Sequence, residues 1–126
     1  MKFQRVLLKL SGEALMGQKE FGIESNALSH YANEIKSIFD LGIEVGVVIG
    51  GGNIYRGVDA ANDGVIEQTQ ADYMGMLATL MNGIALQGAL EKLGVDTRLQ
   101  SALTISEVAE PYIKRRSVRH MEKKRV

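Results

Sequence analysis

Short apolar runs and longer helical patterns divide the chain into predicted strands and helices. Residues 5–10 and 43–49 are short and rich in Val, Leu and Ile, which is typical of buried strands. Between them, residues 28–39 place apolar side chains at helical spacing, with Ser25 as the expected N-cap and Gly42 as the stop. A strand, a helix and a strand in this order predict a right-handed parallel βαβ unit.

A second helical pattern runs from about Gln68 to Leu93 and ends at Gly94. We expect one apolar stripe of this helix to face the core. Its expected members are Met74, Leu77, Ala78, Met81, Ile84, Ala85, Leu90 and Leu93. The segments 13–24 and 58–66 have the glycine and polar content of loops, and the first is expected to lie over the edge of the sheet.

The carboxyl-terminal part of the chain carries weaker signals. Residues 95–102 predict a third, half-polar strand. A helix is expected to start at residues 104–107 and to break at Pro111, with another helix over 112–124. Residues 125–126 then resemble the first step into a further strand. Strands that alternate with helices in this way predict an α/β fold with a mainly parallel sheet.

Three consecutive glycines follow the second predicted strand. Gly50, Gly51 and Gly52 remove every Cβ from the carboxyl end of that strand, so another molecule can approach the backbone N–H groups closely. Ligands of open α/β sheets bind at this edge. A tight turn needs only one glycine, so three of them, followed by Asn53 and Arg56, favour an anion site.

Lys9 and Asp72 are the charged residues most easily connected with such a site. Most strand lysines are exposed edge residues, but Lys9 has apolar neighbours and a Ser-Gly turn follows it, which places its ammonium at the edge that carries the glycines. A positioned lysine commonly holds β- and γ-phosphates. Asp72, in the first turns of the long helix, complements the helix dipole or receives ligand hydroxyls, as acidic residues do for riboses.

Composition narrows the function classes. The 126 residues are 45% hydrophobic, which suits one modest globular domain. No apolar run reaches the roughly 18 residues that a membrane helix needs, and the start of the chain has no signal-peptide pattern, so we expect a cytoplasmic protein. Because the chain has no Cys and only two distant His residues, we expect no disulfide, thiolate site or His-rich metal site.

Charge is unevenly distributed, although the formal net charge is zero. Residues 1–113 carry 8 Lys/Arg against 14 Asp/Glu, whereas residues 114–126 carry 7 Lys/Arg and one Glu. A basic run can bind nucleic acid, but no aromatic residue lies within this one to stack on bases. We therefore expect a solvated helix face here, and no nucleic-acid partner.

The commonest phosphate motifs do not fit the glycines. The chain has no Gly-Lys pair, which excludes a Walker A loop, and the glycine spacing differs from G-x-G-x-x-G. Ser11 lacks the context of a nucleophile elbow, so a Ser/His/Asp hydrolase is poorly supported. Lys9 and a triple-glycine loop at one sheet edge, with Arg56 and Asp72, suit phosphoryl transfer, where catalysis is mainly positioning and charge neutralisation.

Three blocks of sequence, in order, resemble the bacterial uridylate (UMP) kinases of the amino-acid-kinase superfamily. The blocks are residues 8–15, residues 47–53 followed by Arg56-Gly57, and residues 72–83. The resemblance spans nearly the whole chain. It implies a three-layer αβα sandwich with a mainly parallel central sheet, of which residues 1–126 would be the amino-terminal part of a single amino-acid-kinase domain.

The resemblance also implies ATP-dependent phosphorylation of UMP to UDP in pyrimidine nucleotide synthesis, with Lys9 as the catalytic residue. The residues implied in ATP binding are Lys9, Leu10, Ser11, Gly12, Gly52 and Arg56. Gly51 would offer its backbone N–H to the UMP phosphate, and Asp72 would receive the ribose hydroxyls. Mg²⁺ would accompany ATP and be held mainly by the nucleotide phosphates.

Regulation and assembly are implied by the same resemblance. A loop linked to GTP activation would comprise Gly17, Gln18, Lys19, Glu20, Phe21 and Gly22, and Arg98 would be a further regulatory residue. UTP would inhibit, and the full-length protein would form a homohexamer. Because chains of this family continue past the matched blocks and carry their base-reading residues there, we predict that residues 1–126 alone are inactive.

Three other functions remain compatible with the sequence. One is a kinase of the same superfamily that acts on a small acid such as glutamate, aspartate or carbamate, although Asp72 and the Met74-Gly75-Met76 run argue for a nucleotide enzyme. Another is a non-catalytic nucleotide-binding regulatory module. The third is an α/β scaffold whose glycines only turn the chain.

Overall fold

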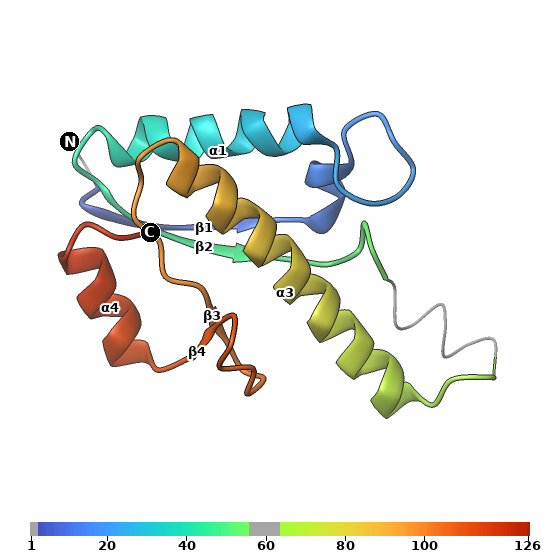
Figure 1. Ribbon diagram of the computed structural model, residues 1–126. Helices are drawn as coiled ribbons and strands as arrows, with labels where there is room; N and C mark the ends of the chain where they lie inside the picture. Colours follow the sequence, from blue (N-terminus) through green and yellow to red (C-terminus); the bar gives the residue numbers. More distant parts are fainter. Residues whose placement is uncertain (1–2, 56–63) are drawn as a thin grey trace.

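The computed structural model describes residues 3–55 and 64–126 (Figure 1). In chain order its elements are β1 (Arg5–Leu10), the 3-10 helix η1 (Gly12–Met16), α1 (Ser25–Phe39), β2 (Glu44–Ile49), α3 (Gln68–Lys92), β3 (Gln100–Ser101), β4 (Glu110–Pro111) and α4 (Lys114–Glu122). The two strands and the two helices that were predicted before residue 94 correspond to β1, β2, α1 and α3, so the main elements are confirmed. None of the described helices is long and apolar enough to cross a membrane.

Strands β1 and β2 form a parallel pair, in register from Arg5↔Glu44 to Leu10↔Ile49. Both consist mostly of Val, Leu and Ile, which favour extended backbone, and α1 supplies the crossover between them. Gly42 has φ +86°, a conformation that glycine adopts without strain, and this turns the chain from α1 into β2. The predicted βαβ unit is therefore confirmed.

The start of α1 differs from its prediction. Ser25 is the first helical residue, and Glu24 holds the N-cap position without a side-chain capping bond. The Glu24 carboxylate instead accepts a hydrogen bond from the Gln18 backbone N–H at 3.2 Å. The prediction of Ser25 as the N-cap is therefore wrong. Glu24 takes that position, and its side chain binds the preceding loop and not the helix end.

Helices α1 and α3 cover one face of the strand pair (Figure 1). The buried cluster beneath them consists of Ala32, Ile35, Val45, Leu86, Leu90 and Val95, and Val6, Leu8 and Leu10 of β1 pack against it. Burying one Leu, Ile or Val side chain contributes about 1.5–3 kcal/mol. This face therefore supplies most of the apolar stabilisation of the chain.

The opposite face of the strand pair is largely open. Leu7 is 69% exposed and Val48 is 50% exposed, although both are apolar strand residues. Helix α4 approaches this face at Gly46, where an added Cβ would lie 3.6 Å from Met121 Sδ. The layers of the expected αβα sandwich are thus present, but the second helical layer is partial.

The carboxyl-terminal region corrects two predictions. Of the strand expected over 95–102, only Gln100–Ser101 is a strand, paired in parallel with Glu110–Pro111. The helix expected from Thr104 does not form, because this segment is rich in Ser and β-branched residues, which disfavour helices. Pro111, the expected helix breaker, lies in β4 itself. The helix predicted over 112–124 is confirmed as the shorter α4.

The predicted buried face of α3 is wrong for its largest side chains. Met74, Leu77, Met81 and Ile84 are 40%, 44%, 54% and 42% exposed. The buried residues of α3 are instead Ala71, Ala78, Leu80, Asn82, Gly83, Leu86 and Leu90. Three of these seven residues are small, Ala71, Ala78 and Gly83. Gly51 lies close against Ala78, and the Leu99 side chain lies close against Gly83, which leaves no room for larger side chains at these two positions.

Candidate functional site

The turn that follows β1 meets the glycine loop, residues 50–52, that follows β2. The Gly50 N–H donates to the Leu10 carbonyl at 2.9 Å, one step beyond the last strand pair. An added Cβ on Gly12 would lie 2.7 Å from Gly52 N, which no real side chain tolerates. Only glycine fits at position 12, so the two turns lie against each other through their backbones.

The glycine loop also lies close to α3. An added Cβ on Gly51 would lie 2.8 Å from the backbone N of Thr79 and 2.9 Å from the Ala78 Cβ. A Cβ on Gly52 would collide with the carboxylate of Glu13 in η1. The Gly51 carbonyl accepts hydrogen bonds from the N–H groups of the next turn, at residues 54 and 55. The loop thus lies between η1 and α3. Gly51 is a steric requirement because the α3 backbone lies against it, whereas the flexible Glu13 side chain could move away from a Cβ at position 52.

Two buried asparagines fix the position of the glycine loop. Asn82 Nδ2 donates to Asn53 Oδ1 at 2.7 Å, and Asn53 Nδ2 donates to Asn82 Oδ1 at 3.2 Å. Asn82 also donates to the Gly50 carbonyl at 2.7 Å, and Asn53 donates to the Gly22 carbonyl at 2.9 Å. Buried polar groups that are fully paired in this way hold one geometry.

Lys9 lies at the same end of the sheet as the glycine loop. It is the next-to-last residue of β1 and pairs in register with Val48. Strand alternation places its exposed side chain on the open face, opposite the core-facing Leu8 and Leu10. Within the described residues Lys9 has no ion-pair partner. A cation at this edge, next to close-packed backbone amides, is suited to bind and neutralise an anion.

The remaining ligand-binding candidates are Leu10, Ser11, Asp72 and Arg56. Leu10 is half-buried, with its carbonyl engaged by Gly50, while Ser11 is exposed. Asp72 is exposed in α3 and accepts a hydrogen bond from Gln68 Nε2 at 2.7 Å. Six residues separate it from Ala78, which corresponds to about 9 Å along the helix axis. Arg56 lies outside the described residues.

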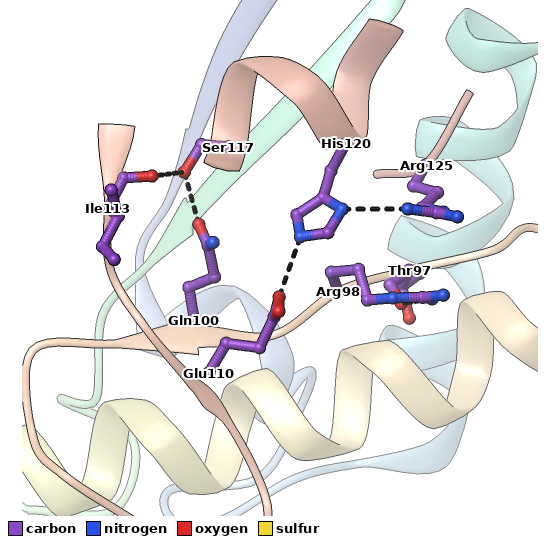
Figure 2. A network of polar contacts seen from close by, with 8 residues as sticks. All are labelled: Thr97, Arg98, Gln100, Glu110, Ile113, Ser117, His120 and Arg125. Carbon is purple, nitrogen blue, oxygen red and sulfur yellow. Dashed lines mark hydrogen bonds and ion pairs between the residues drawn. The ribbon is translucent and has the colours of Figure 1, made fainter. Parts of the chain in front are cut away.

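The candidate regulatory residues lie in two separate places. Gly22 belongs to the loop of residues 17–22, and its N–H donates to the Asn53 carbonyl at 2.8 Å, so the loop is attached to the candidate site. The other members of this loop are exposed. Arg98 is not part of this contact. It lies two residues before β3 in the sequence, and its guanidinium donates to the Thr97 carbonyl at 2.7 Å (Figure 2).

Sequence reasoning missed how the glycine loop is held. Asn53 was read as part of an anion site, and the structure places its amide in the buried pair with Asn82. A signal was present: asparagine is a poor helix former, so Asn82 inside an apolar helix indicates a tertiary hydrogen bond. Glu13, beside Gly52, carried no such signal.

Comparison with known families identifies the domain. Residues 4–124 match the model of the Amino acid kinase family. The chain belongs to the amino acid kinase family. This confirms the family and the α/β fold class that were expected from the sequence.

Among characterised relatives of this family, the chain is similar to uridylate kinases. It is 61% identical to the uridylate kinase of Helicobacter hepaticus over all 126 residues. It also matches the crystal structure of UMP kinase from Bacillus anthracis, with 44% identity and a TM-score of 0.91 over 99% of this chain. The UMP kinase of Ureaplasma parvum matches the whole chain, with 33% identity and a TM-score of 0.87.

The chain spans about half the length of these relatives. It covers 53% of the Helicobacter hepaticus protein, 51% of the Bacillus anthracis chain and 53% of the Ureaplasma parvum chain.

Proposed function

We propose that residues 1–126 form the amino-terminal, phosphate-binding part of a cytoplasmic UMP kinase, which transfers a phosphoryl group from ATP to UMP in pyrimidine nucleotide synthesis. The observation that carries the proposal is the contact between the Gly12 turn and the glycine loop at the strand ends, beside Lys9. The 61% identity to a uridylate kinase supports UMP over a small acid as the acceptor.

Each residue of the edge would have a defined role. The Lys9 ammonium would neutralise the γ-phosphoryl group as a UMP phosphate oxygen attacks it and ADP leaves. Leu10, Ser11, Gly12, Gly52 and Arg56 would surround the ATP phosphates. Gly51 would donate its N–H to the UMP phosphate, and Asp72 would accept hydrogen bonds from the ribose hydroxyls. Preorganised N–H groups of this kind lower the barrier because they need no reorganisation during the reaction.

Mg²⁺ would enter with ATP. The described residues contain no cluster of three or more His, Cys, Asp or Glu side chains that could form a protein cage for the ion. Mg²⁺ commonly retains water and binds through substrate phosphates with few protein ligands. An ion that the nucleotide phosphates hold would need no such cluster, and it would neutralise charge on those phosphates.

Regulation by GTP and UTP forms part of the proposal. The loop of residues 17–22 is joined to the glycine loop through Gly22 and Asn53. An activator bound to this loop would therefore act on the position of the phosphate-binding backbone. Arg98, which lies just before β3 in the sequence and away from this loop, would contact a regulatory nucleotide there.

Homo-oligomerisation, as a hexamer in the full-length protein, is the last part of the proposal. Its support is an exposed stripe on α3, formed by Met74, Leu77, Met81 and Ile84. The stripe has the spacing of a helix–helix seam, and contiguous exposed apolar surface marks interaction sites. A second copy of α3 would cover it.

A chimera tests the catalytic proposal. This chain replaces the matching region of the Helicobacter hepaticus uridylate kinase, and UDP formation from UMP and ATP is measured. We expect turnover, with Lys9→Ala lowering kcat by about 10²- to 10³-fold because a charge-stabilising donor is lost. The matched control is Lys92→Ala at the far end of α3, about 20 Å from Ala78 along the helix, which should leave kcat unchanged.

The same assay separates the alternatives. Phosphorylation of glutamate, aspartate or carbamate in place of UMP would assign the chain to another branch of the family. Nucleotide binding without turnover, unaffected by Lys9→Ala, would indicate a regulatory module. A folded chimera that binds neither phosphate, UMP nor ATP would leave only a structural scaffold.

A further inference from the structure

The side of α3 that packs on the core changes its chemistry along the helix. In the carboxyl-terminal half, Gly83, Leu86 and Leu90 are buried on this side. At 3.6 residues per turn the same line continues toward the amino terminus. Its members there are Gln68, Asp72, Gly75 and Thr79. Polar and small residues thus take the place of the leucines, and such a face is suited to contact a polar ligand.

The amino-terminal turns of α3 extend beyond the strand pair (Figure 1). Gln68 and Asp72 are exposed, and Gly75 and Thr79 are half-buried, although the same side of the helix is buried further along. An added Cβ on Gly75 would meet no described atom within 4 Å. A molecule can therefore approach the α3 backbone closely at this position.

Gly75 has no steric reason among the described residues. A glycine inside a helix costs about 0.5–1 kcal/mol relative to alanine. Gly83, on the same side of α3, is explained by Leu99, whose Cδ1 would lie 2.6 Å from an added Cβ. Because Gly75 lacks such a neighbour, its missing side chain is most simply explained by a ligand that needs the room.

The two ends of this stretch carry the candidate contacts of the acceptor nucleotide. At one end Gly51 lies against α3, where its added Cβ would be 2.8 Å from the backbone N of Thr79. Asp72 lies seven residues earlier, about 10 Å along the helix axis. A phosphate on the Gly51 N–H and ribose hydroxyls on Asp72 would place the sugar over Gly75, which lies between them on the helix.

Gln68 holds the carboxylate of Asp72. Its Nε2 donates to Asp72 Oδ1 at 2.7 Å from one turn earlier on the same side of the helix. The other oxygen and the remaining lone pair of Oδ1 can still accept hydrogen bonds. A carboxylate that is already oriented loses less side-chain entropy when it binds two neighbouring hydroxyls.

We propose that Gln68 and Gly75 are specificity-determining residues of the acceptor site, which select a ribonucleoside monophosphate over its 2′-deoxy form. Gln68 orients Asp72 toward the 2′- and 3′-hydroxyls, and Gly75 leaves the room that the sugar needs. The inference rests on the proposed function, because it takes Gly51 and Asp72 as the phosphate and ribose contacts of UMP. Neither Gln68 nor Gly75 touches the transferred phosphoryl group, so their substitution should change KM and sugar selection with kcat preserved.

The test uses the chimera described above, with kcat and KM measured for UMP and for 2′-deoxy-UMP. Gln68→Glu keeps the size of the side chain but replaces the donor with an acceptor that repels Asp72. We expect KM for UMP to rise about fivefold or more, because an oriented hydrogen bond to a hydroxyl is lost. The preference for UMP over 2′-deoxy-UMP in kcat/KM should fall about threefold or more.

Two further variants control for charge and for the donor. Gln70→Glu adds the same charge on the opposite side of α3, where Gln70 is exposed, and should change KM less than about twofold. Gln68→Lys retains an N–H donor one turn before Asp72 and should preserve the sugar preference. Together they separate a general repulsion of phosphate from the orientation of Asp72.

A second pair of variants tests the room at Gly75. Gly75→Val should raise KM about tenfold or more for both nucleotides, because both sugars would meet the new side chain. Gly88→Val is the matched control, since an added Cβ there also meets no described atom within 4 Å, and it should leave KM unchanged. Gly75→Ala, which adds only a methyl group, should give a smaller rise. Circular dichroism of each variant checks the fold.

The outcomes separate this inference from the proposed function. A chimera that phosphorylates UMP with an unchanged KM in either Gln68→Glu or Gly75→Val would overturn the inference and leave the proposed function intact. An equal loss for UMP and 2′-deoxy-UMP in Gln68→Glu would also overturn it, because Gln68 would then not act through the 2′-hydroxyl. A folded chimera that phosphorylates no UMP would overturn both.

Discussion

Asn53 and Asn82 are 2% and 0% exposed, yet both are polar. Each donates to the side-chain oxygen of the other, and their remaining N–H groups bind the Gly22 and Gly50 carbonyls. Three segments that are distant in sequence are joined through this one pair: the loop before α1, the glycine loop and α3. The position of the candidate phosphate-binding backbone depends on it.

Asn82→Ala should lower the free energy of unfolding by about 1–3 kcal/mol, because the buried Asn53 amide and Gly50 carbonyl lose partners. Urea denaturation followed by circular dichroism measures this. Asn33→Ala is the matched control, since Asn33 is exposed in α1 and its amide donates to the carbonyl and the hydroxyl of Ser29, both on the same helix. Its effect should stay within about 0.5 kcal/mol. Equal effects of the two variants would contradict the role of the buried pair.

Gly51→Ala should also destabilise the chain, by about 1–3 kcal/mol, because its methyl group would overlap Thr79 and Ala78 in a packed interface. Gly88→Ala, where an added Cβ meets nothing within 4 Å, should instead stabilise α3 by about 0.5–1 kcal/mol. Thermal unfolding of both variants shows whether the first lowers the stability of the chain and the second raises it. A neutral Gly51→Ala would show that the glycine loop moves away from α3 without cost.

For individual residues, the sequence predicted which of them gather at the edge of the sheet but not which contacts they make. Lys9, Gly12 and the glycine loop were placed at one sheet edge because parallel strands end together, and the structure brings the two turns into contact. The Asn53–Asn82 pair could not be predicted, because a hydrogen bond over 29 residues depends on how α3 crosses the loop. The roles of Lys9, Asp72 and the other site residues in binding remain predictions.

Helix α3 is the element whose packing departs most from its hydrophobic pattern. It turns Ala71, Ala78 and Gly83 inward, and Gly83 lies so close to Leu99 that an added Cβ would be 2.6 Å from Leu99 Cδ1. The stripe from Met74 to Ile84 is left exposed. Hydrophobicity predicts which residues avoid water, whereas close neighbours select small residues at Ala78 and Gly83. The buried face of α3 therefore combines these small residues with Leu80, Leu86 and Leu90.

Met81→Glu should convert the proposed oligomer of the chimera into smaller species, because a carboxylate at the centre of the α3 stripe cannot be buried against a second copy. Light scattering after gel filtration measures the mass. Since Met81 is 54% exposed in the chain, its stability should change by less than about 0.5 kcal/mol. Ser37→Glu, on the exposed surface of α1, is the control that should leave the oligomer intact. An unchanged mass for Met81→Glu would exclude this stripe as the interface.

The ends of the predicted elements also depended on tertiary contacts. Residues 95–99 are not a strand, because only Gln100–Ser101 pairs with β4, while Asp96 and Arg98 form backbone hydrogen bonds with the single residue Val126. A pattern of side chains can indicate extended backbone, but it cannot show whether a neighbouring strand is present. The helix expected after Thr104 was wrong for a local reason, the poor helix propensity of that segment.

The whole molecule is stabilised from one side. Helices α1 and α3 bury one face of the β1–β2 pair, while the other face and a groove of about 750 Å³ beside β2 remain apolar and open. Sequence patterns predicted the parallel α/β class well, because strand and helix periods are local properties. The same patterns could not predict the open face, because β1 and β2 carry apolar side chains on both faces, which is typical of fully buried strands.

The isolated chain is expected to show no ADP release with UMP and ATP, because the family resemblance implies that the base-reading residues lie outside residues 1–126. One face of the β1–β2 pair is also open to solvent. A coupled assay of ADP formation measures this, with the Helicobacter hepaticus uridylate kinase as the positive control. Turnover comparable with that enzyme would show that residues 1–126 contain a complete active site.

Asn82 is followed directly by Gly83. In flexible peptides this dipeptide readily loses ammonia through a cyclic imide, which leaves aspartate or isoaspartate. The rigid backbone of α3 keeps the Gly83 nitrogen from attacking the amide. A molecule that unfolds for long enough would be altered chemically, and on refolding it would set a carboxylate against the Gly50 carbonyl and the Asn53 oxygen. The pair that orders this edge also makes prolonged unfolding an irreversible event.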